Sequence, residues 1–257
     1  MIITDTHAHL YIEAFDQDRD AMIKRAMTEG VERFFLPAID STYTQSMLEL
    51  KQAYPDYMYM MMGLHPTHVK ENYKDELKHV KEQLESGNYV AVGEIGIDLY
   101  WDKSTLHIQQ EAFRFQIGLA KSHQLPIVIH SRESFDEIFE ILEEEQVDQD
   151  QLRGIFHCFT GNLEQAKRAI DLNMKLGIGG VVTFKNGKID KFLDQIELEH
   201  IVLETDAPYL APAPFRGKRN ESAYIIHVLN KLSEIYGKST AEIADITTEN
   251  SKSLFKI

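Results

Sequence analysis

The feature that most constrains the fold is a repeat of short β-branched or aromatic runs along the 257 residues. Eight such runs end near His9, Pro37, Leu64, Gly96, His130, Cys158, Gly179 and Asp206. Successive ends lie 21 to 34 residues apart, and one strand with one crossover helix occupies about that length. The pattern therefore predicts strands that alternate with helices.

The segments between these runs carry helical signals. Apolar residues recur at helical spacing after Asp16 and again between the fourth and fifth runs. These two predicted faces consist of Met22, Ile23, Ala26 and Met27, and of Ile108, Ala112, Phe115 and Leu119. Gly30 is placed to end the first helix, Asn162 can begin a later one, and Ser239 with Glu242 has the spacing of a capping box. Each signal supports a crossover helix.

Alternating strands and helices imply right-handed βαβ units and a parallel sheet. Eight units in 257 residues predict the α/β class and a (β/α)8 TIM barrel. A doubly wound open sheet is the alternative, but it would usually carry a glycine-rich turn where this chain has Tyr-Ile-Glu-Ala-Phe after Leu10. Because no low-complexity linker interrupts the pattern, we predict one domain over residues 1–257.

The charge balance limits the partners of this chain. It has 41 acidic and 27 basic residues, for a formal net charge of −14, which excludes a basic coat for nucleic acids. Its 43% apolar residues are enough for one large core. An overall negative field repels polyanions, so a phosphate-bearing substrate would have to be held by a local positive site. The acidic stretch Glu143–Glu145 with Asp148 and Asp150 is most simply a solvated helix end and loop.

Cysteine usage and the N-terminus bear on the compartment. Cys158 is the single cysteine, so an internal disulfide and a cysteine-based zinc cluster are both excluded. The first residues have no basic segment typical of a signal peptide, and no apolar run approaches the roughly 20 residues of a membrane span. We predict a cytoplasmic protein without a membrane partner, and no obligate protein partner is evident.

Residues of metal-binding types stand at the ends of five predicted strands. They are His7, His9, Glu94, His130, His157 and Asp206. The C-terminal ends of parallel barrel strands form the face where barrel active sites occur, so these side chains are expected to converge. Six ligands exceed a four-coordinate site and a carboxylate can bridge, which predicts two divalent ions roughly 3.5 to 4 Å apart. Histidine and carboxylate ligands suit Zn, Mn, Co or Mg, and such a pair of ions points to hydrolysis.

The strings around these residues resemble the TatD family of metal-dependent hydrolases. The matching strings are DTHAH at 5–9, GEIGID at 93–98, IHSR at 129–132, HCFTG at 157–161, VTFKN at 182–186 and ETDAPYL at 204–210. The resemblance runs from residue 4 to residue 255. Two positions depart from it, because Leu99 stands where the family usually shows tyrosine and Ser222 where it usually shows proline. The family has amidohydrolase-like barrels, and its characterised members are divalent-metal deoxyribonucleases, often 3′ to 5′ exonucleases.

The resemblance also implies roles for the candidate ligands. His7, His9 and Asp206 would hold the first metal, His130 and His157 the second, and Glu94 would bridge the two. Asp206 would also act as the general base. Glu204, which is in phase with Asp206 on the same predicted strand, is a candidate to orient a ligand or to accept a proton, and Asp5 is a candidate to orient the first two histidines or to make a structural hydrogen bond.

A phosphate would need cationic groups or hydrogen-bond donors in the loops beyond the strands. The candidates that match family positions or lie in matched segments are His65, Arg132, Lys185, Asn186 and Arg219. Arginine suits bidentate phosphate contacts. The alternative interpretation of Arg219 and its neighbours Arg216 and Lys218 is a solvated basic loop. Tyr100, Trp101 and Tyr209 are candidates to stack a base or to pack.

Together these observations predict a metal-dependent hydrolase that cleaves phosphodiester bonds in DNA. The predicted substrate is a single strand or a strand end, cut by a water that two metals activate, and the resemblance implies cutting from the 3′ end. Two alternatives on the same barrel are an amidohydrolase or lactonase for a small molecule and a deacylase for charged tRNA. A metal-dependent binding module without catalysis is an alternative of another class.

Overall fold

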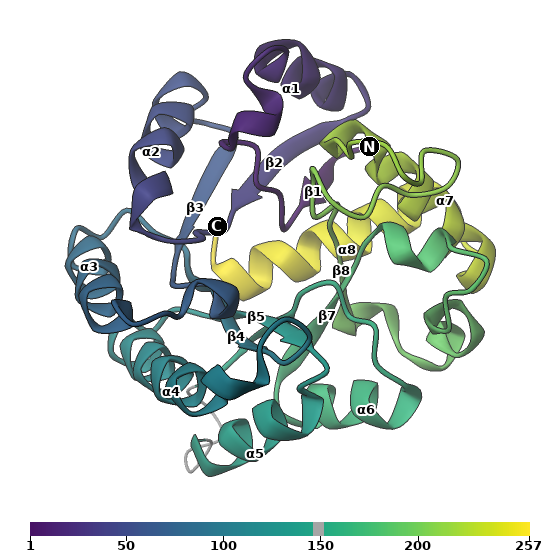
Figure 1. Ribbon diagram of the computed structural model, residues 1–257. Helices are drawn as coiled ribbons and strands as arrows, with labels where there is room; N and C mark the ends of the chain where they lie inside the picture. The colour runs from purple at the N-terminus through teal and green to yellow at the C-terminus, as the bar shows by residue number, and fades with distance from the viewer. Residues whose placement is uncertain (146–151) are drawn as a thin grey trace.

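The computed structural model describes residues 1–145 and 152–257, and its centre is one sheet of eight parallel strands in the order β1 to β8 (Figure 1). The strands are Ile3–Asp5 (β1), Val31–Leu36 (β2), Met58–Met62 (β3), Ala91–Asp98 (β4), Ile127–Arg132 (β5), Gly154–Phe156 (β6), Met174–Ile178 (β7) and Ile201–Leu203 (β8). The α-helices are Arg19–Thr28 (α1), Thr44–Ala53 (α2), Tyr73–Glu85 (α3), Leu106–His123 (α4), Phe135–Glu145 (α5), Leu163–Asp171 (α6), Ile225–Tyr236 (α7) and Thr240–Phe255 (α8). The predicted alternation and the predicted TIM barrel are confirmed. Asp148 and Asp150 lie outside the described residues.

The barrel closes where the first and last strands meet. The N–H of Thr6 donates to the carbonyl of Leu203 at 2.9 Å, and the N–H of Asp206 donates to the carbonyl of His7 at 2.9 Å. A parallel bridge between Ala8 and Ala207 completes the contact. These residues form a closing seam, and it lies among the candidate metal ligands.

The regular strands at this seam are shorter than predicted. β1 ends at Asp5 and β8 ends at Leu203, whereas the sequence pattern placed their ends near His9 and Asp206. Asp206 has a φ of 57°, in the left-handed region that non-glycine residues seldom adopt. The chain therefore leaves the regular ladder just where its polar side chains are presented, and strain of this kind is typical of functional sites.

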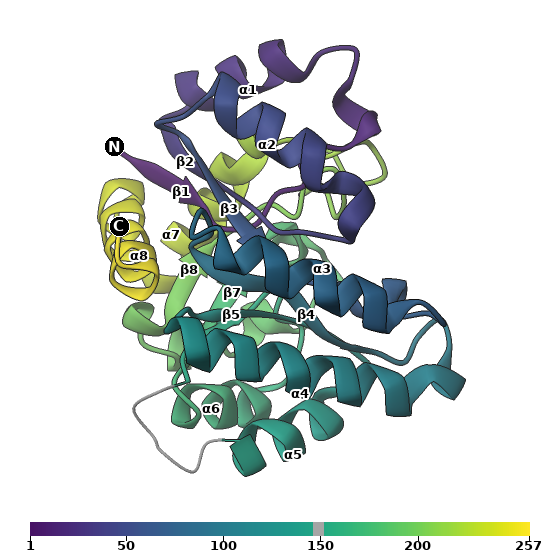
Figure 2. The same ribbon diagram turned by 90° about the vertical axis from the view of Figure 1, so that its left-hand side faces the viewer.

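Helix α8 lies across the end of the barrel from which the strands start (Figure 2). Its residues Leu254 and Phe255 pack against the inward-facing apolar layer, and the rings of Phe35 and Phe255 have centroids 4.1 Å apart. That layer consists of Phe35, Met61, Ala91, Val128, Ile155 and Val202. This end of the barrel is thus filled with apolar side chains, and the polar residues gather at the other end. None of the described helices combines the length and apolar character that crossing a membrane requires, and a cytoplasmic location stays a prediction.

Helix α4 departs from the predicted pattern. Phe115 was expected on its apolar face but is 43% exposed, because the buried face is rotated and includes two glutamines, Gln109 and Gln116. Gln116 accepts a hydrogen bond from the Leu64 N–H at 2.7 Å, and Gln109 bonds both the N–H and the carbonyl of Asp98, at 2.8 and 3.1 Å. These two glutamines therefore fix two strand ends that border the site. In other helices, the predicted caps at Asn162 and Ser239 are confirmed as capping boxes.

Candidate metal centre

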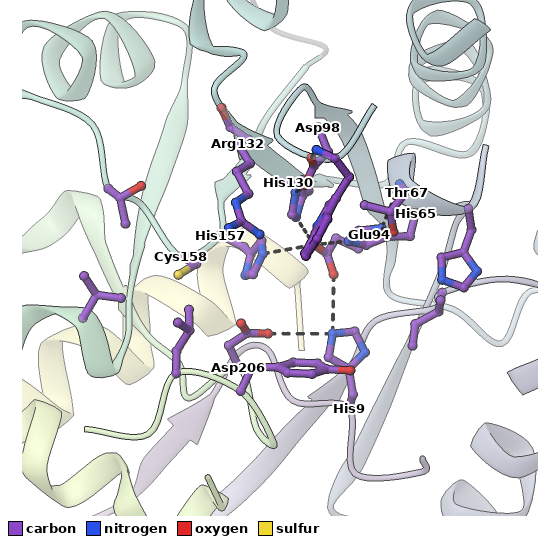
Figure 3. A pocket seen from close by; sticks show the side chains of 18 residues that line it. His9, His65, Thr67, Glu94, Asp98, His130, Arg132, His157, Cys158 and Asp206 are labelled. Carbon is purple, nitrogen blue, oxygen red and sulfur yellow. Dashed lines mark hydrogen bonds and ion pairs between the residues drawn. The ribbon is translucent and has the colours of Figure 1, made fainter. Parts of the chain in front are cut away.

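The carboxylate of Glu94, at the centre of strand β4, lies among five imidazoles at the open end of the barrel. Figure 3 shows those of His9, His65, His130 and His157. Its Oε1 faces Nδ1 of His130 at 2.8 Å, Nε2 of His157 at 3.0 Å and Nε2 of His65 at 3.1 Å. Its Oε2 faces Nε2 of His7 at 3.1 Å and Nε2 of His9 at 3.5 Å. The two oxygens of one carboxylate therefore separate the histidines into two groups.

Asp206 joins the second of these groups. Its Oδ1 lies 3.8 Å from Nε2 of both His7 and His9, and the rings of His7 and His157 stack with centroids 3.8 Å apart. Three sets of donor atoms come within 4.8 Å of one another, and they are His7, His157 and Asp206; His7, His9 and Glu94; and His65, Glu94 and His130. The structure thus brings all six predicted ligands together, and it adds His65, which the sequence suggested as a phosphate contact.

The electrostatics of the cluster follow from burial and from the mutual charges. Burial lowers the pKa of His7, and it lowers the pKa of His65 to about 4, so both rings stay neutral. Burial would raise the pKa of Glu94, but the neighbouring histidines, His157 first, hold it well below its usual range. Burial would lower the pKa of His157, yet Glu94 and Glu204 raise it well above 6.5. Divalent ions bind ionised carboxylates and neutral imidazoles, the forms that Glu94, His7 and His65 already have, and a bound cation would displace the proton from His157. The residues therefore fit a metal centre.

Asp98 is a site residue that the sequence analysis did not single out. Its Oδ2 lies 2.8 Å from Nε2 of His130, its Oδ1 accepts the N–H of Tyr100 at 3.0 Å, and it is 2% exposed. A carboxylate in this place fixes the orientation of a ligand ring. The sequence could have indicated Asp98 by its spacing, because a residue four positions after Glu94 lies on the same face of a strand.

Glu204 lies behind His157 and outside the set of side chains that line the cavity. Its Oε1 accepts the N–H of Cys158 at 2.5 Å and lies 3.5 Å from Nδ1 of His157. The space for it depends on Gly177, because a Cβ there would come 2.2 Å from Oε2 of Glu204. This geometry supports the orienting role predicted for Glu204, not direct proton transfer from a substrate water.

Asp5 acts on the backbone at the closing seam. It accepts hydrogen bonds from the N–H and the hydroxyl of Thr205 at 2.9 and 2.7 Å and from the hydroxyl of Ser222 at 2.6 Å. Its contact with His7 is to the backbone N–H, at 3.4 Å. Of the two roles considered for Asp5, the structural hydrogen bond describes these contacts.

A cavity of about 580 Å³ opens over the cluster, and two of the five predicted phosphate-binding residues line it. His65 and Arg132 are on its wall, whereas Lys185, Asn186 and Arg219 are not. Asn186 accepts a hydrogen bond from Arg216 at 3.1 Å. Arg219 donates two hydrogen bonds to the carboxylate of Asp18, both at 2.7 Å, and its guanidinium lies 4.7 Å over the ring of Phe15. Arg219 therefore fastens its loop to the N-terminal region.

Replacing Arg219 with alanine is expected to reduce stability while leaving substrate affinity unchanged. Hydrogen bonds from Arg219 lower the pKa of Asp18 to about 2, so the pair contributes stability above about pH 4 and loses it as the pH falls towards 2. Since both side chains are about one-third exposed, we expect Tm to fall by about 4 °C or less at neutral pH and by less near pH 2. Calorimetry at both pH values measures this, and a rise in KM for an oligonucleotide would instead place Arg219 in the substrate site.

Comparison with known proteins gives consistent matches over the whole chain. A family model described as TatD related DNase matches residues 4–256. The chain is 42% identical to the uncharacterized metal-dependent hydrolase YabD of Bacillus subtilis, with 100% of both chains covered. It is 29% identical to the 3′-5′ ssDNA/RNA exonuclease TatD of Pectobacterium parmentieri, over 98% of this chain and 99% of the other. The solved structure of YjjV, a TatD homologue from Escherichia coli, matches with a TM-score of 0.92 and 31% identity over 99% of this chain and 98% of that one.

Proposed function

This chain belongs to the TatD family of metal-dependent hydrolases, and from that premise we propose that it is a deoxyribonuclease that removes nucleotides from the 3′ ends of single strands. The observation that carries the proposal is the division of five histidines between the two oxygens of Glu94, inside an open cavity. Such a carboxylate is suited to bridge two divalent ions. When bound, the ions would lower the pKa of a water molecule and neutralise the charge that develops on an attacked phosphoryl group.

The side chains of this protein would divide the remaining work. His7, His9 and Asp206 would hold one ion, and His65, His130 and His157 surround the oxygen of Glu94 that faces the other. Asp206 is placed to accept the proton of the attacking water, because it is at the cavity wall and burial raises its pKa to about 6. Asp98 and Glu204 would keep the rings of His130 and His157 in orientation.

A single strand fits the charge distribution better than a duplex. The net charge of −14 disfavours binding to the extended polyanion of duplex DNA, whereas Arg132 provides a local cation in the cavity. The substrate named for the Pectobacterium relative, ssDNA or RNA, is of the same kind. We therefore propose localised binding of a strand end, with a shallower salt dependence than that of a basic DNA-binding protein.

Removing the metals tests this proposal. We expect chelation to abolish cleavage of a single-stranded oligonucleotide and re-addition of Mn, Zn, Co or Mg to restore it, with elemental analysis giving about two ions per chain when the protein is active. The same preparations are assayed on amide and lactone substrates. Turnover of those substrates without cleavage of DNA would replace the nuclease with the amidohydrolase or lactonase alternative, and metal binding without turnover of any of them would favour a binding module.

A further inference from the structure

Arg132, at the end of strand β5, is a cation of the cavity that no carboxylate neutralises among the residues the structure describes. Five other arginines form ion pairs with carboxylates, and they are Arg19, Arg25, Arg114, Arg168 and Arg219. The guanidinium carbon of Arg132 instead lies 3.6 Å from the centroid of the Tyr100 ring and 5.5 Å from that of Trp101. Its side chain extends towards His157 at the metal centre (Figure 3). An unpaired arginine in a chain of net charge −14 is prepared for an anionic ligand.

Trp101 provides a flat apolar surface beside this cation. It is 72% exposed although it lines the same cavity, and Tyr209, which is 50% exposed, lines the cavity from the loop after strand β8. The rings of Tyr100 and Trp101 are perpendicular, with centroids 4.9 Å apart. The Tyr100 ring therefore contacts both Trp101 and the guanidinium of Arg132. With 72% of its surface exposed, the ring of Trp101 remains accessible to a ligand. A tryptophan that is exposed at a cavity mouth is suited to stacking with a planar group.

We propose that Trp101 and Arg132 form a nucleotide platform, in which Trp101 stacks on the base and Arg132 contacts the phosphate of an unpaired nucleotide adjoining the cleaved bond. The platform rests on the proposed function and specifies how the protein would select its nucleic-acid substrate. The ligand must combine a planar ring with a negative charge, because the platform combines an aromatic surface with an unpaired guanidinium. In a duplex both faces of an internal base are stacked on other bases, so the platform favours single strands and frayed ends.

A binding measurement on the metal-loaded protein tests the platform without requiring catalysis. The probe is a phosphorothioate-linked oligothymidylate, which resists hydrolysis, and it is compared with an abasic strand of the same length and linkage. Trp101 is the single tryptophan of the chain, so its emission reports directly on this position. We expect the oligothymidylate to change the emission of Trp101 and to bind about tenfold or more tightly than the abasic strand, since stacking on aromatic side chains contributes about that factor per base. Equal affinity for the two strands with unchanged emission would overturn the platform.

Substitutions separate the contribution of base stacking to the binding affinity from that of the positive charge. By anisotropy of labelled strands, Trp101→Ala is expected to weaken binding of oligothymidylate about tenfold and to leave binding of the abasic strand unchanged, whereas Trp101→Phe keeps most of the affinity. Arg132→Ala is expected to weaken the binding of both strands, because both carry the phosphate that Arg132 would contact. The matched control is Tyr57→Ala, because Tyr57 is also exposed, at 37%, but lines a separate cavity with Met27 and Arg33. Equal losses for both strands in Trp101→Ala, with its Tm and circular dichroism unchanged, would assign Trp101 to packing and contradict the platform.

The two proposals can fail separately. If the protein binds the strands as expected but cleaves no DNA, the nuclease proposal fails and the platform stands as a nucleotide-binding site. If it cleaves DNA while Trp101→Ala has wild-type affinity and rate, the platform fails and the nuclease proposal stands.

Discussion

Replacing Glu94 with glutamine is expected to remove the bound metals and to reduce hydrolysis by about 10³-fold or more. Glutamine has nearly the same shape but lacks the charge that five imidazoles now surround, with ring nitrogens between 2.8 and 3.5 Å from the carboxylate. Loss of the ions removes several kcal/mol of transition-state stabilisation, and each ~1.4 kcal/mol corresponds to a factor of ten. Elemental analysis gives the ions per chain, and initial rates on a single-stranded oligonucleotide give the activity.

A matched glutamate-to-glutamine variant outside the metal centre shows whether the loss of metal and activity is specific to Glu94. Glu242 is the third residue of helix α8 and part of its capping box, a position where glutamine replaces glutamate without loss of the cap, so Glu242→Gln should keep the metal content and rate of the parent protein. Asp98→Asn is expected to fall between the two, with about 10- to 100-fold lower metal affinity or activity, because it disturbs the orientation of His130 while the remaining amide oxygen can still accept the N–H of Tyr100. Two ions per chain and an unchanged rate in Glu94→Gln would contradict the central role of Glu94.

The strand pattern was sufficient to predict the barrel and to gather six ligand-type residues at one end of it. Both results depend on local rules, since alternation within a strand decides which side chains share a face and the polarity of a parallel sheet decides where its strand ends meet. His7 and His9, two residues apart, accordingly both face Oε2 of Glu94 although the regular strand ends before them.

Contacts between distant segments could not be predicted in the same way. Arg219 lies in a string that suggested phosphate binding, yet its partner Asp18 is 201 residues away in the chain and only the folded structure brings them together. Gln109 and Gln116 lie on the buried face of α4 although the predicted apolar face did not include them, because they bond strand ends that the helix pattern does not reveal. Polar residues whose partners are remote in sequence were therefore misassigned or missed.

Replacing Asp206 with asparagine is expected to lower kcat by about 10² to 10⁴-fold while changing the affinity for an uncleavable strand much less. Asp206 adopts a φ of 57°, and asparagine tolerates this conformation, so the substitution removes the charge without adding backbone strain. Burial raises the pKa of this carboxyl to about 6 in the metal-free protein, and a bound cation favours its ionised form, so at neutral pH it is ready to accept a proton.

The contrast with Glu204→Gln then identifies which of the two acids transfers the proton. Glu204 is fully buried behind His157 and has no access to the cavity, so its substitution should lower activity only about 10- to 100-fold, through the orientation of that ring. kcat and the dissociation constant of a phosphorothioate strand are measured for both variants, together with their metal content. If Asp206→Asn raised KM at an unchanged kcat, Asp206 would be a binding residue, and a larger loss of kcat in Glu204→Gln would transfer the role of general base to Glu204.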